Sequence, residues 1–252
     1  MSDIDQQNNT EVVQEGYGSL ERAALGHFHF SISDIMSESW ERIKGNKGTI
    51  WLALILIIVI SAIVNVVCKY VLNLVGIVLP DSPSFTAAYI VPTFVLAPIL
   101  AAMVTTPLTA GIWMLSIKLA TDQVVEPTEV TKYYSKWLNL FLTYLAMFAL
   151  ILIGYCLLIL PGIYLAVAFY FALPLAAEKN MSVWQALETS RRAVNHIWFP
   201  LFGLMFIFGL LCMASIFTLF IGMIWLLPMM IMSYGVMYRI IFGVEKSVVV
   251  SA

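Results

Sequence analysis

The chain has 252 residues, of which 61% are hydrophobic and 11% are charged, and its net charge at pH 7 is −2. Soluble domains carry about 25% charged residues, so this composition excludes an ordinary soluble domain and indicates a membrane protein. The slightly acidic balance offers nucleic acid no large basic surface. The three cysteines lie far apart in apolar runs, which predicts neither a disulfide framework nor a metal centre.

Four long runs without Asp, Glu, Lys or Arg predict the membrane helices. One crossing needs about 20 residues, so the two shorter runs predict one crossing each and the two longer runs predict two each. The fold class that follows is an all-α, polytopic membrane helical bundle with six transmembrane helices. The runs are Thr49–Cys68 with 20 residues, Ser82–Ile117 with 36, Trp137–Ala177 with 41 and Ile197–Tyr238 with 42.

The ends of the chain are predicted to be tails around one membrane domain. Met1–Gly26 contains five acidic residues and one arginine, whereas a secretory signal needs a basic start and an apolar core. We therefore expect a disordered cytoplasmic tail over residues 1–27. The membrane domain is assigned to residues 28–243 and a cytoplasmic C-terminal tail to residues 244–252.

The first element after the tail is predicted to be an amphipathic helix over Phe28–Gly48 that lies on the membrane surface. Ser31 can cap this helix, and Asp34 stands three residues later as in a capping box. Gly45 and Gly48 are expected to let the chain turn into the membrane. An apolar stripe at helical spacing consists of Ile32, Met36, Trp40 and Ile43. Cations that suit the helix dipole and anionic head groups lie near the end, namely Arg42, Lys44 and Lys47.

The first two crossings flank the clearest turn signal in the chain. Thr49–Cys68 is the first crossing, with an extension towards Leu79 left open. The cluster at Pro80–Pro83 predicts an exposed turn. Because Ser82–Ile117 is longer than one crossing needs, the part before about Pro92 is assigned to the far membrane surface.

A second interfacial helix is predicted in the polar segment Lys118–Lys136. Pro127 and Thr128 mark its start, since proline suits the first helical position. An apolar face at helical spacing is formed by Val130, Tyr133, Tyr134 and Trp137. The third crossing then covers about Trp137–Leu158.

The rest of the chain predicts two hairpins joined by a third interfacial helix. Pro161 and Gly162 are expected to form the tight turn between the third and fourth crossings. The next helix opens at Ser182, with Gln185 completing a capping box. The fifth and sixth crossings turn near Phe220–Gly222. The apolar stripe of the interfacial helix consists of Val183, Trp184, Leu187, Val194 and Trp198.

The basic residues predict the orientation. With six crossings and a cytoplasmic N-terminus, 12 of the 13 lysines and arginines are cytoplasmic and Lys69 is the exception. This bias is what the positive-inside rule expects. All three interfacial helices and both termini are then cytoplasmic.

The one compact charged cluster at a membrane edge consists of Glu178, Arg191 and Arg192. These arginines could bind lipid head groups or a partner, with Glu178 fixing the loop. The alternative is a solvated face, in which an exposed ion pair contributes about 0–1 kcal/mol. Together with the cations of the first interfacial helix, the candidate contact residues for lipid or a partner are Glu178, Arg191, Arg192, Arg42, Lys44 and Lys47.

The predicted crossings contain little that indicates catalysis, a metal or a cofactor. No charge falls well inside them, and hydroxyls or amides there usually bond across helices or to their own backbone. His27 and His29 are expected to be solvated rather than metal-bound. Prolines that interrupt membrane helices favour packing, although broken helices also mark transporter sites; they are Pro98, Pro107, Pro174 and Pro228.

Leu160–Trp198 resembles the signature of a bacterial group of six-helix inner-membrane proteins. In that group a Leu-Pro-Gly-Ile-Tyr hairpin precedes a helix ending in an acid and then an Ala-Leu-x-x-Ser helix. The matching residues are Leu160–Tyr164, Pro174, Glu178, Ala186, Leu187 and Ser190. The opening SDIMSESWERIKGNKGTIW is also similar, and the resemblance spans about Ser31–Gly243.

The group includes the membrane domain of some glycerophosphodiester phosphodiesterases and many stand-alone membrane proteins. Nine residues follow Gly243 in this sequence, so no phosphodiesterase domain is expected and the resemblance implies no catalysis. We predict a non-catalytic accessory or organising component of the bacterial inner membrane that contacts lipids or a membrane partner. The alternatives are a transporter of small solutes or lipids and, less favoured, a lipid-modifying enzyme.

Overall fold

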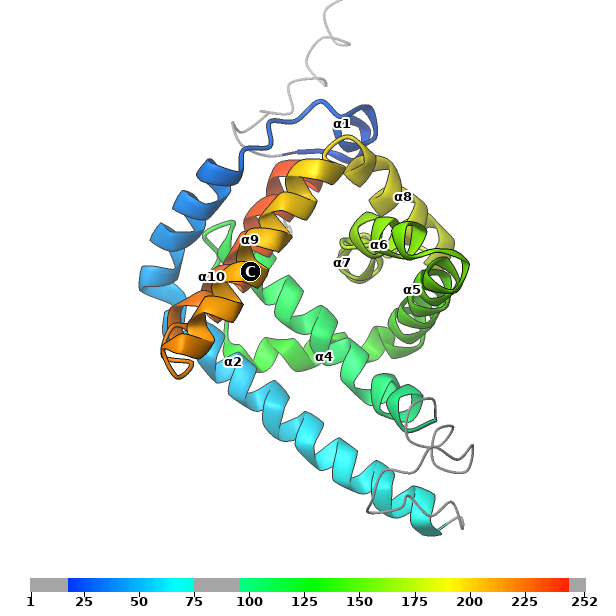
Figure 1. Cartoon of the computed structure of the whole chain (residues 1–252). Helices are drawn as coiled ribbons and strands as arrows, with labels where there is room; N and C mark the ends of the chain where they lie inside the picture. Colours follow the sequence, from blue (N-terminus) through cyan, green and yellow to red (C-terminus); the bar gives the residue numbers. More distant parts are fainter. Residues whose placement is uncertain (1–17, 75–95, 245–252) are drawn as a thin grey trace, which may run out of the picture.

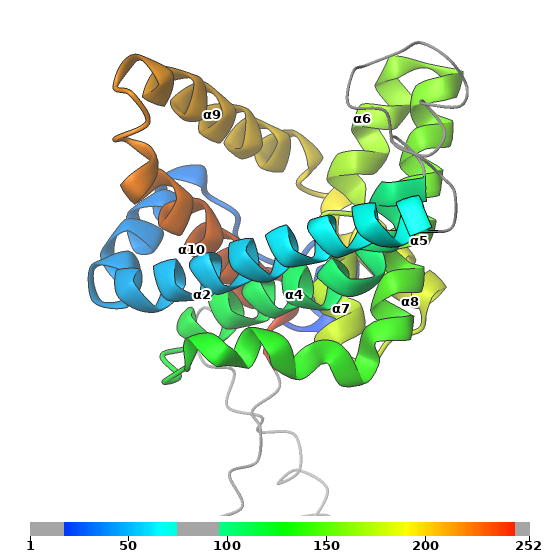
Figure 2. The ribbon, with the colours of Figure 1, turned by 90° about the horizontal axis from the view of Figure 1, so that it is seen from below.

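The computed structural model describes residues 18–74 and 96–244 (Figures 1 and 2). This part of the chain is all-α and contains no strand, which confirms the predicted fold class. The helices are α1 (Leu20–Leu25), α2 (Ile32–Leu74), α4 (Ala97–Leu119), the 3₁₀ helix η2 (Pro127–Lys136), α5 (Trp137–Leu157), α6 (Ile159–Ala168), α7 (Ala172–Glu178), α8 (Val183–Asn195), α9 (Trp198–Phe217) and α10 (Met223–Phe242).

Six helical segments in the described residues are long and apolar enough to cross a membrane, which confirms the predicted number. The chain therefore has the helices of a multi-pass membrane protein. The segments are Ile32–Leu72, Ala97–Leu119, Pro127–Leu157, Ile159–Glu178, Trp198–Phe217 and Met223–Phe242. The predicted turn at Pro80–Pro83 and the segment before Pro92 lie outside the described residues.

The core of the bundle lies where α4 and α10 pack against each other and against α2. A side chain at Gly235 of α10 would collide with the carbonyl oxygen of Ser116 in α4, so glycine allows these two backbones to touch. In Figure 2, α2 and α4 run across the view while α6 rises steeply beside them. The six apolar segments therefore do not form a parallel up-and-down bundle.

The predicted turn at Gly45 and Gly48 is wrong, because α2 is one helix of 43 residues. Glycine in a helix costs only about 1 kcal/mol relative to alanine, and burial of Ile43 and Ile50 on either side keeps the helix continuous. The predicted surface helix and the first crossing are thus two halves of α2. The described part of α2 ends at Leu74.

The first half of α2 runs antiparallel to α10. At one end, Glu38 pairs with Arg239 at 2.8 Å. At the other end, the Lys47 ammonium lies 4.7 Å from the centre of the Trp225 ring, three residues after Gly222. The sequence prediction had placed Lys47 and the Gly222 turn on opposite membrane surfaces. The structure brings Lys47 close to this turn, so the two cannot lie on opposite membrane surfaces.

The second predicted interfacial helix is a 3₁₀ helix that continues directly into α5. A 3₁₀ helix has three residues per turn, so Val130 and Tyr133 lie on one side and pack into the core. Trp137, predicted to share that face, is 41% exposed. The predicted stripe assumed a period of 3.6 residues and was wrong for this reason.

The turn between the third and fourth crossings lies at Leu158 rather than at Pro161 and Gly162. Leu158 is extended, and α6 starts at Ile159 with Pro161 in its first turn. Proline suits that position because the first helical N–H groups have no intrahelical acceptor. A side chain at Gly162 would collide with the Tyr155 ring. The Pro-Gly pair therefore begins α6 and permits its close contact with α5.

The fourth crossing is broken between α6 and α7, and a serine from α8 closes the break. The Ser190 hydroxyl donates to the carbonyl oxygen of Ala168 at 2.8 Å and accepts from the Phe171 N–H at 3.2 Å. The Tyr234 hydroxyl donates to the next free carbonyl, that of Tyr170, at 3.0 Å. Backbone groups freed inside a membrane need such partners, which gives the serine of the Ala-Leu-x-x-Ser motif a physical role.

The helix predicted to open at Ser182 is confirmed as α8, together with its capping box between Ser182 and Gln185. Its buried face differs from the predicted stripe because Trp184 is 67% exposed. The buried residues are Ala186, Leu187, Ser190, Ala193 and Val194. The α9–α10 turn lies at residues 218–222, where the sequence predicted it.

Candidate functional site

A network of charges joins α2, α4 and α10. Glu38 accepts from Arg42 at 2.6 Å and from Arg239 at 2.8 Å. Arg42 also contacts Asp122 at 2.7 Å, and Arg239 donates to the carbonyl oxygen of Ala120 at 2.8 Å. Cations are favourable at the carbonyl end of a helix, here α4. Arg42, a predicted lipid contact, is therefore engaged within the protein.

Glu178 is also held inside the fold. Its carboxylate accepts a hydrogen bond from the Tyr238 hydroxyl and lies 3.7 Å from the Lys179 ammonium. The side chain is only 9% exposed. Nearby, the Lys136 ammonium donates to the carbonyl oxygen of Ala177 at 2.6 Å. Glu178 thus ties α7 to α10, and its low exposure does not suit a role in surface recognition.

The two arginines of α8 share the carboxylate of Glu188, which was not among the residues predicted from the sequence. Arg191 donates twice to Glu188 at 2.8 Å, and Arg192 donates to it at 2.7 Å. These hydrogen bonds lower the pKa of Glu188 to about 2. The i, i+3 and i, i+4 spacing was the signal that could have identified this carboxylate as the partner.

The same arginines are exposed, and exposed aromatic side chains stand about two turns before them on α8 and at the start of α9. Arg191 is 36% exposed and Arg192 is 63% exposed. Trp184 at the start of α8 and Phe199 at the start of α9 are 67% and 80% exposed. This combination of cations and exposed aromatics is typical of a protein surface at the membrane–water boundary. We call these four residues together with Glu188 the α8 edge.

The remaining candidates, Lys44 and Lys47, lie on the outer side of α2. Lys44 is exposed and Lys47 is partly exposed. Lys47 stands over the ring of Trp225, and the neighbouring Trp51 donates from its indole N–H to the carbonyl oxygen of Ile224 at 3.2 Å. The six predicted contact residues are therefore divided. Arg42 and Glu178 hold the fold together, and the other four lie at exposed edges.

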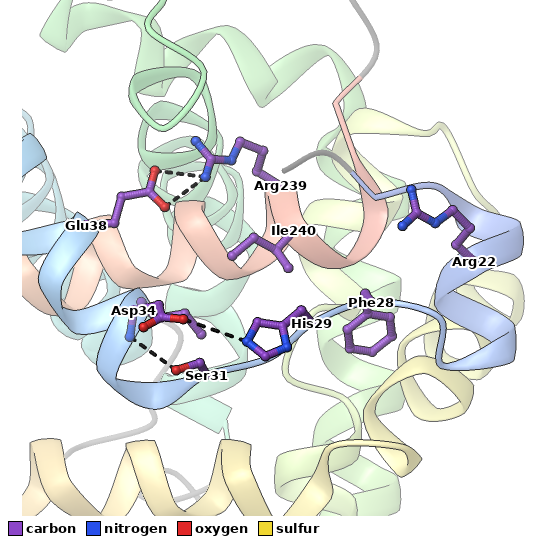
Figure 3. Close-up of a pocket in the computed structure, with 9 residues that line it drawn as sticks. Arg22, Phe28, His29, Ser31, Asp34, Glu38, Arg239 and Ile240 are labelled. Carbon is purple, nitrogen blue, oxygen red and sulfur yellow. Dashed lines mark hydrogen bonds and ion pairs between the residues drawn. The ribbon is translucent and has the colours of Figure 1, made fainter. Parts of the chain in front are cut away.

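The structure has a pocket of about 320 Å³, lined by charged and apolar side chains, that the sequence did not predict (Figure 3). The His29 ring lies 3.7 Å from the Asp34 carboxylate, and both side chains are exposed. Ser31 caps α2 by accepting from the Asp34 N–H at 3.4 Å, as predicted. The pocket lies where the described chain begins and ends, and it is lined by Arg22, Phe28, His29, Ser31, Asp34, Ile35, Glu38, Arg239 and Ile240.

Polar groups within the apolar helices bond mainly to backbone carbonyl groups, as the sequence led us to expect. Thr105, Thr106 and Thr109 donate to the carbonyl oxygens four residues earlier. Asn65 does the same, and Asn139 donates to the carbonyl oxygen of Met181. Among the described residues, no cluster of three His, Cys, Asp or Glu side chains is arranged to hold a metal ion.

Comparison with protein-family models, with curated proteins and with solved structures gave no match. The resemblance to the six-helix inner-membrane group therefore stays a prediction. Among the described residues, the α8 edge combines exposed arginines with exposed aromatic side chains.

Proposed function

We propose that the protein is a non-catalytic, accessory component of the bacterial inner membrane that binds anionic phospholipids through the α8 edge. The observation that carries the proposal is that Arg191 and Arg192 are exposed on the same helix as the exposed Trp184 and shortly before the exposed Phe199. Tryptophan is enriched where the bilayer meets water. Basic residues near an anionic leaflet contribute about 1 kcal/mol each to binding.

The hydrogen bonding of the edge supports phosphate recognition. Glu188 neutralises one of the two arginines, so the three groups together carry a net charge of +1. Arg192 contacts Glu188 through its Nε, and its two terminal nitrogens make no hydrogen bond within the described residues. Guanidinium groups bind phosphate oxygens through two parallel hydrogen bonds. A lipid phosphate at Arg192 would then complete the charge balance.

The ends of the described chain support termini on one side of the membrane. The Gly18 N–H donates to the carbonyl oxygen of Arg239 at 2.9 Å, and Gly243 contacts Gly18. As part of the proposal, this side is cytoplasmic, since the positive-inside rule assigns most basic residues to it.

The proposal is tested by native mass spectrometry of the purified protein with bound lipids. Arg192→Gln is compared with Lys132→Gln, because the two cations are 63% and 66% exposed and each pairs with a carboxylate. We expect Arg192→Gln to lower the retained phosphatidylglycerol about fivefold and Lys132→Gln to leave it unchanged. Equal lipid retention by both variants and the wild type would contradict the proposal.

A transporter of small solutes or lipids is the second candidate, favoured by the break between α6 and α7. Broken helices mark substrate sites in many transporters. Ser190 and Tyr234 already satisfy three backbone groups at this break, which supports a structural role instead. Uptake or lipid scrambling by vesicles containing the purified protein, and its loss in Ser190→Ala, would favour the transporter.

A further inference from the structure

A second surface feature, separate from the α8 edge, is a groove of about 320 Å³ between α2, α9 and α10. Ligand pockets in proteins have volumes of about 300–1,000 Å³. One wall comes from Trp40 of α2, and the rest comes from the end of α9, the start of α10 and the turn between them. The lining residues are Trp40, Leu211, Ala214, Ser215, Thr218, Gly222, Trp225, Leu226 and Met229.

The groove is apolar in effect, although two hydroxyl groups line it. The Ser215 hydroxyl donates to the carbonyl oxygen of Cys212 at 2.6 Å, and the Thr218 hydroxyl donates to that of Ser215 at 2.9 Å. Both hydroxyl protons are thus used within the helix end. The groove therefore suits a hydrocarbon chain better than a polar solute.

The turn beside the groove satisfies its backbone N–H groups internally. Every backbone N–H from Thr218 to Leu226 donates to an acceptor between Ser215 and Gly222. Because an unpaired backbone N–H is costly in apolar surroundings, this bonding suits the turn to an apolar neighbour such as a lipid chain in the groove. The large exposed side chains here are also apolar, with Phe217 at the end of α9 91% exposed and Leu219 in the turn 84% exposed.

The opposite wall of the groove carries the features of a membrane–water boundary. Trp40, Lys44, Lys47 and Trp51 follow one another at three- and four-residue spacing, which places them on one face of α2. The ring of Trp225 covers one side of the Lys47 ammonium. Lysine has three N–H donors, so its outer side can still bind an anion. Tryptophan and lysine together are typical of the head-group level.

We propose that this groove binds one acyl chain of an anionic phospholipid, with the head-group phosphate at Lys44 and Lys47. The apolar lining accounts for the chain, and the two adjacent cations provide the charge complementarity for the phosphate. A volume near 320 Å³ equals about ten water volumes, so the groove holds part of one chain. The site is distinct from the α8 edge, and each can fail without the other.

The test titrates the purified full-length protein with phosphatidylglycerol or phosphatidylcholine of matched chains and counts bound lipids by native mass spectrometry. Ala214→Phe fills the groove from an exposed lining position. Met213→Phe is the matched control, because Met213 is 64% exposed on the adjacent position and does not line the groove. Lys44→Gln with Lys47→Gln removes the cations and leaves the groove open. Circular dichroism checks that each variant is folded.

We expect Ala214→Phe to weaken the tightest binding of both lipids at least about tenfold, with Met213→Phe unchanged. The double lysine variant should keep phosphatidylcholine binding and lose about tenfold of the preference for phosphatidylglycerol. Equal binding by Ala214→Phe, Met213→Phe and wild type would overturn the proposal. A protein or second copy that occupies the groove and is released by Ala214→Phe would overturn the lipid assignment. Whichever of these results is obtained, Arg192→Gln tests lipid binding at the α8 edge independently of the groove.

Discussion

The charge network of α2, α4 and α10 and the α8 edge contain the same kinds of side chain and use them in opposite ways. In the network, Glu38 is shared by Arg42 and by Arg239, which is only 9% exposed. At the α8 edge, Glu188 is shared by Arg191 and Arg192, which are 36% and 63% exposed. Both are one carboxylate between two arginines, but only the second can reach an external anion.

The comparison shows that a basic residue near a membrane helix is not by itself a lipid contact. The network connects three helices that are far apart in the sequence, and its role is to hold their ends together. The α8 edge connects residues three and four apart on one helix, which contributes little to stability. Its cations remain available for head groups, as do Lys44 and Lys47 beside the groove.

The largest expected effect comes from breaking the network. Glu38→Gln removes the carboxylate that two arginines share, and losing one partner of a largely buried ion pair costs about 3 kcal/mol or more. We expect a clear fall in the thermal unfolding midpoint of the detergent-purified protein. Glu188→Gln is the matched control on the α8 edge and should change the midpoint very little. Equal effects of the two variants would remove the distinction between the regions.

The next effect separates the two faces of α8. Ser190 is fully buried and bridges the α6–α7 break, so Ser190→Ala leaves a buried N–H and a buried carbonyl without their partner. We expect a loss of about 2 kcal/mol of stability. Thr189→Ala, on the neighbouring and partly exposed position, serves as the control in the same unfolding assay. A Ser190→Ala protein as stable as the control would show that the break is held by other contacts.

The start of α8 should show a smaller effect. Ser182 and Gln185 form a capping box, and replacing a capping serine with alanine costs about 1 kcal/mol. Hydrogen exchange of the first turn of α8 should increase in Ser182→Ala, while the α6–α7 break keeps its protection. If the exchange of both segments rises together, α8 does not open independently of the break.

The smallest expected effect is a pH dependence of the α8 edge. The arginines lower the pKa of Glu188 from its ordinary 4.5 to about 2, so its contribution is complete above pH 4.5 and is lost as the pH falls towards 2. Because the pair is exposed, we expect a change of at most about 0.5–1 kcal/mol. The stability difference between wild type and Glu188→Gln, measured from pH 6 to pH 2, should shrink over that range. A difference that grows on acidification would contradict the pairing.

Local signals predicted much of the fold. The apolar runs indicated six helices, the Ser182–Gln185 box indicated the start of α8, and the turn near residues 220–222 was placed correctly. These features depend on residues close in sequence. The continuity of α2 and the 3₁₀ geometry of η2 depend on packing against other helices, so composition and periodicity did not reveal them.

The candidate site was predicted only in part for the same reason. Arg191 and Arg192 were identified as exposed cations, but Glu38 and Arg239 lie 201 residues apart, and no local pattern links them. Glu178 was grouped with the arginines by sequence distance, whereas the fold turns it towards Tyr238. Lys47 was recognised as a cation near a membrane, but its position over Trp225 required the antiparallel packing of α2 and α10.

The most direct test of the central distinction measures thermal unfolding with and without added phosphatidylglycerol. A ligand that binds only the folded protein raises its stability, so the lipid-induced shift reports binding and the starting midpoint reports the fold. We predict that Glu38→Gln starts lower than wild type and keeps the lipid-induced shift. The double variant Arg191→Gln with Arg192→Gln should start near wild type and gain less from the lipid. A double variant with a lower starting midpoint and an unchanged lipid shift would contradict the account.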